Sequence, residues 1–138
     1  MAAEDQLTRV PLFQDLPKKS LERIAKTIRT RNFRAGDVIF KEGEEGVGFF
    51  IVTKGKVDIT RGGTKLASNG PDGFFGEMAL LDHHRRSATV TAAEDTECLA
   101  IMRSDFLAEV RNNPDLAIDM LAAMSKRIRD LDERLSQS

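Results

Sequence analysis

The spacing of apolar residues changes twice along the chain. Near the N-terminus, apolar residues recur three or four positions apart, at Leu21, Ile24, Ala25 and Ile28. Together with Pro17, which suits a first helical turn, this spacing predicts an amphipathic helix over residues 17 to 29.

From about residue 33 to residue 102, the apolar residues instead form short or alternating segments separated largely by glycine-bearing turns. We expect strands over residues 37–41, 48–53, 56–61, 65–68, 88–93 and 96–102. Short strands of this kind predict a compact antiparallel β unit, either a barrel or a jelly-roll-like β-roll.

Helical spacing returns at the C-terminus. Ser104 can cap a helix running to about Arg111, and Asn113-Pro114 interrupts it before a longer helix that extends toward Leu135. The longer helix carries an apolar seam of the a/d type, at Leu121, Met124, Ile128, Leu131 and Leu135. The seam has two interpretations, a coiled coil with a second copy or a lid folded over the β-roll, and both predict a buried Leu131.

The predicted fold is therefore α+β and mostly β, an antiparallel β-roll with an N-terminal helix and two C-terminal helices. At 138 residues and 41% hydrophobic content, the chain can close one core without metal or disulfide. We expect a single domain over residues 1–138, with the β-roll at about 33–102 and the C-terminal helices at about 104–135. The lone Cys98 sits in an apolar segment and is expected to be a buried core residue.

Charge and hydropathy narrow the range of partners. Lys and Arg total 21 against 22 Asp and Glu, so no overall basic character indicates binding to nucleic acid or to a membrane. No signal-peptide order and no apolar run of ~20 residues is present, and the expected location is cytoplasmic.

Candidate chemistry gathers in residues 75 to 91, FGEMALLDHHRRSATVT. If Gly76 ends a strand and residues 77–81 form one helical turn, the first amides of that turn favour an anion. Arg86 can offer two parallel donors to a phosphate, and Glu77 can accept a hydrogen bond from a sugar hydroxyl. The pair suggests a sugar phosphate, although a surface ion pair worth ~0 to 1 kcal/mol would use the same residues.

The stretch resembles the phosphate-binding cassette of the cyclic nucleotide-binding domain family. That family includes catabolite activators, regulatory subunits of cyclic-AMP-dependent protein kinase and cyclic-nucleotide-gated channels. The resemblance covers about residues 10 to 135, because further landmarks follow in family order: P-L-F-Q-D-L-P at 11–17, R-A-G-D-V-I-F-K-E-G at 34–43, F-F-I-V-T-K-G-K-V at 49–57 and N-N-P-D at 112–115.

The resemblance implies roles for named residues. Glu77 matches the glutamate that binds the ribose 2'-hydroxyl, and Arg86 matches the arginine that binds the exocyclic phosphate oxygens. Backbone amides near Gly76, Ala79, Ser87 and Ala88 would complete the phosphate cradle. The implied ligand-binding set is Phe75, Gly76, Glu77, Met78, Ala79, Arg86, Ser87, Ala88, Arg127 and Leu131. Arg127 would pair with the cassette glutamate, and Leu131 would form an apolar lid over the purine.

The sequence departs from the family pattern at three places. Arg85 stands where the family usually has proline, which raises the question of which arginine binds phosphate. Pro71-Asp72-Gly73 replaces the usual order P-G-D. Ser87 occupies a position linked to the choice of base, so cyclic AMP is favoured and cyclic GMP stays open.

The resemblance implies a regulatory sensor that relays cyclic nucleotide binding through its C-terminal helices, with no further cofactor. A metal enzyme of the cupin type is disfavoured because the two histidines, His83 and His84, are adjacent in a loop, and no catalytic residue is expected. Direct DNA binding is not expected, since no recognition helix follows the long helix. Partners would be the nucleotide and either a homodimer through the last helix or another protein. The chain fits a complete small protein, a piece of a larger transcription factor, channel or enzyme, or a degenerate interaction domain.

Overall fold

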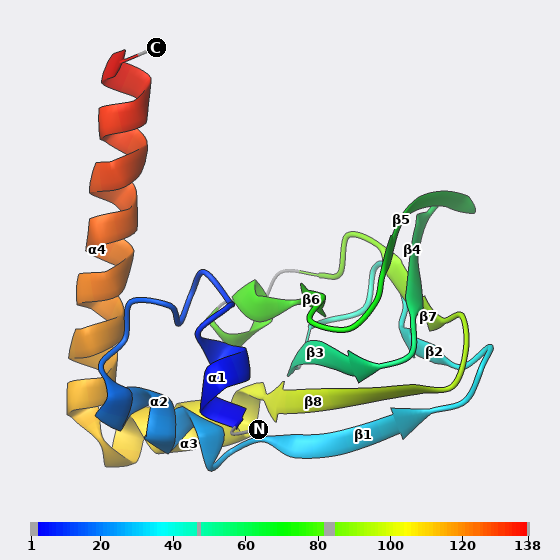
Figure 1. Cartoon of the computed structure of the whole chain (residues 1–138), viewed down its shortest axis with the longest axis horizontal. Helices are drawn as coiled ribbons and strands as arrows, with labels where there is room; N and C mark the ends of the chain where they lie inside the picture. Colours follow the sequence, from blue (N-terminus) through cyan, green and yellow to red (C-terminus); the bar gives the residue numbers. More distant parts are fainter. Residues whose placement is uncertain (1–2, 47, 82–84, 138) are drawn as a thin grey trace. The chain divides into compact units, whose positions relative to one another are not determined.

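Residues 3–46, 48–81 and 85–137 are described by the computed structural model of the chain (Figure 1). They form two compact units, which we describe separately. The β unit comprises Thr27–Leu107, and the helical unit comprises the residues up to Lys26 together with those from Ala108 onward.

Among its described residues, the β unit contains eight strands in two antiparallel sheets. One sheet has the order β1-β8-β3-β6 and the other β2-β7-β4-β5. The strands are β1 (Arg29–Phe33), β2 (Val38–Phe40), β3 (Gly48–Lys54), β4 (Val57–Arg61), β5 (Thr64–Asn69), β6 (Phe74–Phe75), β7 (Thr89–Ala92) and β8 (Thr96–Met102). A 3-10 helix, η1 (Glu77–Leu80), follows β6. Figure 1 shows β1, β8 and β3 lying side by side, as their pairing requires.

The core of the β unit comes from side chains of both sheets. Its buried members are Phe50, Val52, Val57, Phe75, Val90, Cys98 and Ala100. Alternation explains part of this set, because Cys98 and Ala100 share one face of β8. The rings of Phe50 and Phe75 stack with centroids 5.4 Å apart, so the short strand β6 is held by ring packing as well as by its pairing with β3.

The turn between β3 and β4 shows why one glycine is required. Gly55 has a φ of 91°, and a Cβ at this position would lie 2.3 Å from the carbonyl oxygen of Asp95. Only glycine meets both conditions without moving the backbone.

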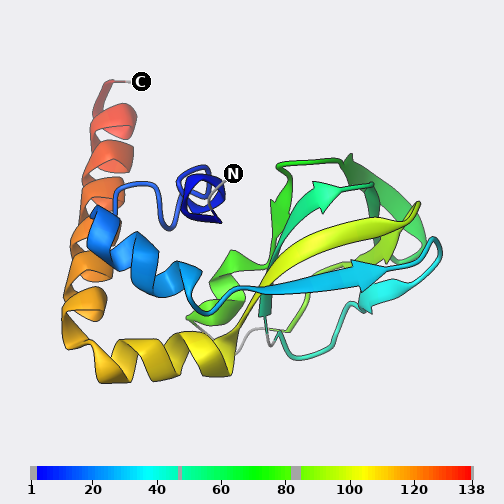
Figure 2. The ribbon, with the colours of Figure 1, turned by 60° about the horizontal axis from the view of Figure 1, so that its bottom comes forward.

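The helical unit contains α1 (Ala3–Leu7), α2 (Lys18–Ala25), the end of α3 (Arg103–Asn112) and α4 (Pro114–Gln137). Figure 2 shows α4 as one continuous helix, and Pro114 begins it, where a missing N–H costs no hydrogen bond. The Ser20 hydroxyl donates to Asp119 Oδ2 at 2.7 Å and so ties α2 to α4. Buried apolar residues come from α1, the segment after it, α2 and α4: Leu7, Val10, Leu12, Phe13, Leu16, Leu21, Ile24, Leu116, Met120 and Ala123.

The predicted fold class is confirmed, and each of the six predicted strands overlaps an observed strand. The helix predicted over residues 17–29 is wrong at its end, because α2 stops at Ala25 and Arg29 already belongs to β1. The strand β1 and the helix α1 were not predicted, and β6 was expected only as a strand that ends at Gly76, without bounds. The sequence RTRNF in β1 has little apolar alternation, and its strand conformation comes from pairing with β8, from Arg29 opposite Ala100 to Phe33 opposite Thr96.

The apolar seam of α4 is largely exposed in the single chain. Leu121 is 66% exposed, Leu131 53% and Leu135 73%. The expectation of a buried Leu131 is therefore wrong for one chain alone. The buried stripe of the helix runs instead through Leu116, Met120 and Ala123, three and four residues apart near its start.

The prediction of a single domain over residues 1–138 stays a prediction. Among the described residues, no helix combines the length and hydropathy needed to span a bilayer.

Candidate ligand-binding site

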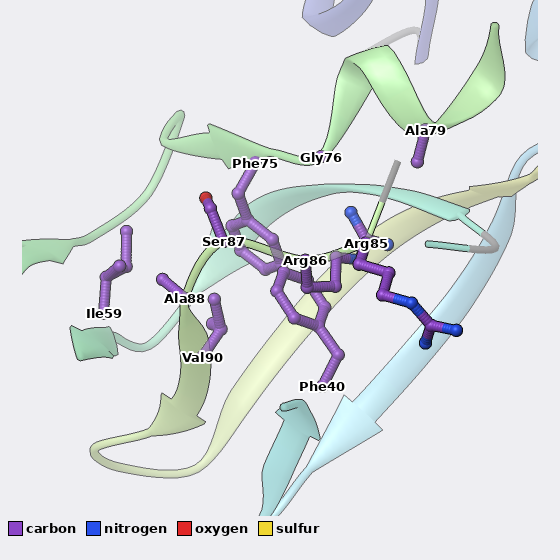
Figure 3. A pocket seen from close by; sticks show the side chains of 10 residues that line it. All are labelled: Phe40, Ile59, Phe75, Gly76, Ala79, Arg85, Arg86, Ser87, Ala88 and Val90. Carbon is purple, nitrogen blue, oxygen red and sulfur yellow. The ribbon is translucent and has the colours of Figure 1, made fainter. Parts of the chain in front are cut away.

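A cavity of about 530 Å³ opens in the β unit beside η1 (Figure 3). Its lining combines apolar residues, two arginines and small residues: Phe40, Ile59, Phe75, Gly76, Ala79, Arg85, Arg86, Ser87, Ala88 and Val90. Of the ten predicted ligand-binding residues, Phe75, Gly76, Ala79, Arg86, Ser87 and Ala88 lie together on this cavity.

The apolar wall is built by strand register. Phe40 of β2 lies opposite Val90 of β7, which in turn lies opposite Ile59 of β4. Residues paired in this way project on the same side of a sheet, so the three side chains form a row across one face. The Phe40 ring also meets the Phe75 ring edge-on, with centroids 5.6 Å apart.

Gly76 connects β6 to η1, as expected from the sequence. Its φ is 85°, and a Cβ there would lie 2.3 Å from Arg86 Nη1 and 3.1 Å from the Gly48 carbonyl oxygen. A glycine is thus needed both for the backbone conformation and for the approach of the guanidinium. The N–H of Ala79 donates to the Gly76 carbonyl at 3.0 Å, so this amide, predicted to face a phosphate, is engaged within the turn.

The backbone of Arg86 is fixed to the loop between β2 and β3. Its N–H donates to the Glu44 carbonyl at 2.7 Å, and its carbonyl accepts from the N–H of Gly43 at 2.8 Å. An isolated bridge between Glu45 and Arg85 continues this pairing. The two segments therefore hold Arg86 at one place on the cavity wall.

The Arg86 guanidinium has only part of its hydrogen-bonding capacity satisfied. Nη2 donates to the Gly48 carbonyl oxygen, and Cζ lies 3.9 Å from the centroid of the Phe40 ring. Nε is buried and has no hydrogen-bond partner among the described residues. A buried donor without an acceptor is costly, so this group favours an incoming acceptor, above all an anion.

Burial is the main cause that lowers the pKa of Arg86, and the nearby Arg103 cation lowers it further while Glu44 opposes both. An arginine nevertheless stays protonated at neutral pH. The cavity therefore carries a partly desolvated positive charge close to a second one. An anion bound here would offset both the repulsion between the two arginines and the cost of burying the Arg86 charge.

Arg85 differs from its neighbour. It also lines the cavity, but its side chain is exposed and its Nη1 donates to the Gly43 carbonyl at 2.8 Å. The two adjacent arginines thus have different settings: Arg86 is half-buried against a ring and a glycine, whereas Arg85 is exposed.

The remaining predicted site residues are placed differently. The backbones of Glu77 and Met78 begin η1, but their side chains lie outside the described part of the structure, as do Asp82, His83 and His84. Arg127 and Leu131 line another cavity, of about 210 Å³, within the helical unit beside Pro11 and Gln14. Their predicted roles at the ligand stay predictions.

The sequence did not single out Phe40, Ile59 and Val90. Each lies in a predicted strand, but only the register across β2, β7 and β4 brings the three onto one cavity. Arg103, whose positive charge lowers the pKa of Arg86, did not belong to any motif identified in the sequence.

Comparison with known proteins agrees with this geometry. A family model described as a cyclic nucleotide-binding domain matches residues 30–113. The chain belongs to this family.

Several relatives of this cyclic nucleotide-binding domain are larger proteins. A cyclic AMP receptor protein from Thermus thermophilus is 38% identical over 130 residues, which cover 91% of this chain and 60% of the relative. A cyclic nucleotide-gated potassium channel from Mesorhizobium japonicum is 40% identical over 108 residues, which cover 78% of this chain and 30% of the channel. The chain thus spans less than two thirds of either relative.

A solved structure of similar extent is the N-terminal domain of a transcriptional regulator from Streptomyces coelicolor. It is 30% identical, with a TM-score of 0.81, over 94% of this chain and 96% of that one. The β-roll and its helices are therefore shared with a domain that has been solved on its own.

Proposed function

We propose that this cyclic nucleotide-binding domain is a sensor that binds cyclic AMP in the cavity beside η1. The observation that carries the proposal is the Arg86 guanidinium on the cavity wall. Its Nη1 lies beside the backbone of Gly76, and its Nε is buried without a hydrogen-bond partner among the described residues. A cyclic phosphate would supply the missing acceptor, and a charge-assisted bond of this kind contributes ~1.5 to 3 kcal/mol.

The other contacts follow from the same pose. Glu77 would accept a hydrogen bond from the ribose 2'-hydroxyl, and the row of Phe40, Ile59 and Val90 supports an apolar part of the ligand. Ser87 has an exposed side chain on the cavity and can reach a phosphate or a base edge. Cyclic AMP is the preferred ligand and cyclic GMP the weaker one. No further cofactor is required.

The role is regulatory rather than catalytic, in keeping with the family. Ligand binding would change the C-terminal helices, to which Arg127 and Leu131 belong, and these would bring an arginine to the cassette glutamate and an apolar cover to the purine. The signal would pass to a second copy or to another protein. Because the chain spans 60% of the Thermus receptor and 30% of the channel, a sensor module within a larger protein is the natural setting.

Calorimetric titration of cyclic AMP and cyclic GMP into the chain tests the proposal. We expect measurable binding of both, with cyclic AMP the tighter. Arg86→Leu should weaken cyclic AMP binding more than about tenfold, over ~1.4 kcal/mol. Arg85→Leu is the matched variant, because it removes an adjacent arginine that is exposed, and it should cost much less.

Circular dichroism would verify that both variants fold. Equal losses from the two variants would remove the special role of Arg86. Failure of both nucleotides to bind the unaltered chain would leave a domain used for protein contacts and would refute the sensor function.

A further inference from the structure

Arg103 is a largely buried cation next to the cavity. It does not line the cavity itself, but it contacts Ala79, which does. Its side chain is 12% exposed, and it is the first residue of α3. The three nitrogen atoms of its guanidinium contact three different residues. Nε donates to the Ala79 carbonyl at 2.7 Å, Nη2 donates to the Gly46 carbonyl, and Nη1 lies 3.5 Å from Glu45 Oε1.

The acceptors belong to two segments, of which only η1 lines the cavity, through Ala79. Glu45 and Gly46 lie in the loop between β2 and β3. The two segments approach each other closely, because a Cβ at Gly46 would lie 2.9 Å from Ala79 Cβ and 3.2 Å from Arg86 Cζ. A planar guanidinium that bonds both segments fixes their separation more firmly than a flexible ammonium would.

The same loop also helps to position Arg86. Glu44, in this loop, accepts the hydrogen bond from the Arg86 N–H, and Gly48, the first residue of β3, accepts the one from Arg86 Nη2. A movement of the loop away from η1 would therefore displace the Glu44 acceptor of the Arg86 backbone. Arg103 acts on Arg86 through this loop and through η1, and its charge also repels the Arg86 cation directly.

Resting on the proposed function, we propose that Arg103 is a positioning residue for the nucleotide pocket. It does not touch the ligand. It holds η1 and the loop between β2 and β3 at the spacing that places the Arg86 guanidinium beside Gly76. Because Arg103 also begins α3, the pocket and the first turn of this helix share one side chain.

The test compares affinity with stability in four versions of the full chain: unaltered, Arg103→Gln, Arg103→Lys and Thr96→Ala. Thr96 is the matched control, because its hydroxyl is buried and bonded to the Lys56 and Glu94 carbonyls but does not line the cavity. Urea unfolding gives the stability of each protein, and calorimetry gives its affinity for cyclic AMP. We expect Arg103→Gln to weaken binding about tenfold and Arg103→Lys to weaken it less, whereas Thr96→Ala loses stability with unchanged affinity.

A second readout follows Arg86 itself. The NMR signal of its Nε–H, recorded without nucleotide, should shift in Arg103→Gln and stay in place in Thr96→Ala. The affinity loss should also be non-additive, so that Arg103→Gln adds little to the loss already caused by Arg86→Leu.

The outcomes separate the two proposals. If the unaltered chain binds cyclic AMP while Arg103→Gln keeps both its affinity and the Arg86 signal, the positioning role is refuted and the sensor function stands. If the unaltered chain binds neither cyclic nucleotide, the sensor function fails, and an unmoved Arg86 signal would then refute the positioning role as well. Should Arg103→Gln fail to fold, Arg103→Lys decides by the same criteria.

Discussion

Gly76 illustrates how one residue serves both the backbone and the pocket. Its left-handed conformation and its contact with the Arg86 guanidinium each exclude a side chain. The two causes can be separated, because Gly36 has a comparable φ of 92°, but beyond its two chain neighbours no described atom lies within 4 Å of the position of a Cβ.

We therefore expect Gly76→Ala to lose stability and cyclic AMP affinity, whereas Gly36→Ala loses only stability. The strain common to both is about 1 kcal/mol. Chemical unfolding and calorimetry on the two variants measure the two effects. Equal cyclic AMP affinities of the two variants would show that the Arg86 side chain can move away from an added Cβ without weakening binding.

Cys98 gives a prediction about pH. It is fully buried, as expected from its apolar neighbours, and burial is the main cause that raises the pKa of its thiol from 9.0 to about 11. The folded chain thus keeps the proton that the unfolded chain releases first. The resulting stability is complete below about pH 9 and is lost as the pH rises toward 11.

Cys98→Ala should remove this part of the pH dependence. Between pH 8.5 and 10.5, roughly, the free energy of unfolding of the unaltered chain should fall by about 1 to 3 kcal/mol more than that of the variant. Urea unfolding at several pH values measures the difference. Parallel curves for the two proteins would mean that the thiol is not the titrating group.

At the scale of elements, α4 has two stripes of different character. The buried stripe near its start belongs to the helical unit, whereas Leu121, Ile128 and Leu135, seven residues apart, are exposed. Seven-residue spacing of apolar side chains is typical of a helix that pairs with another helix. We expect the exposed stripe to pair with that of a second copy.

Replacement of Leu121 and Ile128 together by lysine should convert a dimer to a monomer in light scattering. Each apolar side chain buried in such a pair contributes about 1.5 to 3 kcal/mol. Glu133→Lys, a charge change at an exposed position of the same helix, should leave the dimer in place. A monomeric unaltered chain, with and without nucleotide, would favour the lid interpretation instead.

The sequence predicted most elements because their signals are local. Alternation and glycine turns located six strands, and Asn113-Pro114 located the break between α3 and α4. The strand β1 escaped prediction because it is polar and pairs with β8, some seventy residues away in the sequence. The strand β6 has only two residues, too few for a periodic pattern.

The same reasoning applies to the candidate site. The cassette residues that lie together on the cavity are close in the sequence, so a motif could group them. Phe40 and Ile59 reach the cavity through register across β7, and Arg103 reaches it through hydrogen bonds to carbonyl groups. Every residue has a backbone carbonyl group, so hydrogen bonds to these groups cannot be predicted from residue types.

At the scale of the whole molecule, the chain joins its two units through α3, which begins at Arg103 in the β unit and ends in the helical unit. A ligand can alter the helical unit only by binding two arrangements with different affinity. We expect hydrogen exchange with saturating cyclic AMP to slow in η1 and at residues 85–88, and also in α3 and α4.

The Arg86→Leu variant, mixed with the same concentration of nucleotide, is the control and should show both effects reduced in proportion to its lower occupancy. Slower exchange confined to the β unit would mean that the domain binds its ligand without passing the signal to the helices.

The contact between Arg86 and the Phe40 ring has a kinetic consequence. A long side chain that is already held against a ring and a carbonyl group loses little further rotamer freedom when it captures a ligand. The pocket is thus preorganised, and encounter should proceed without a slow rearrangement of this arginine. Substitutions around it should consequently change the residence time of the nucleotide far more than its association rate.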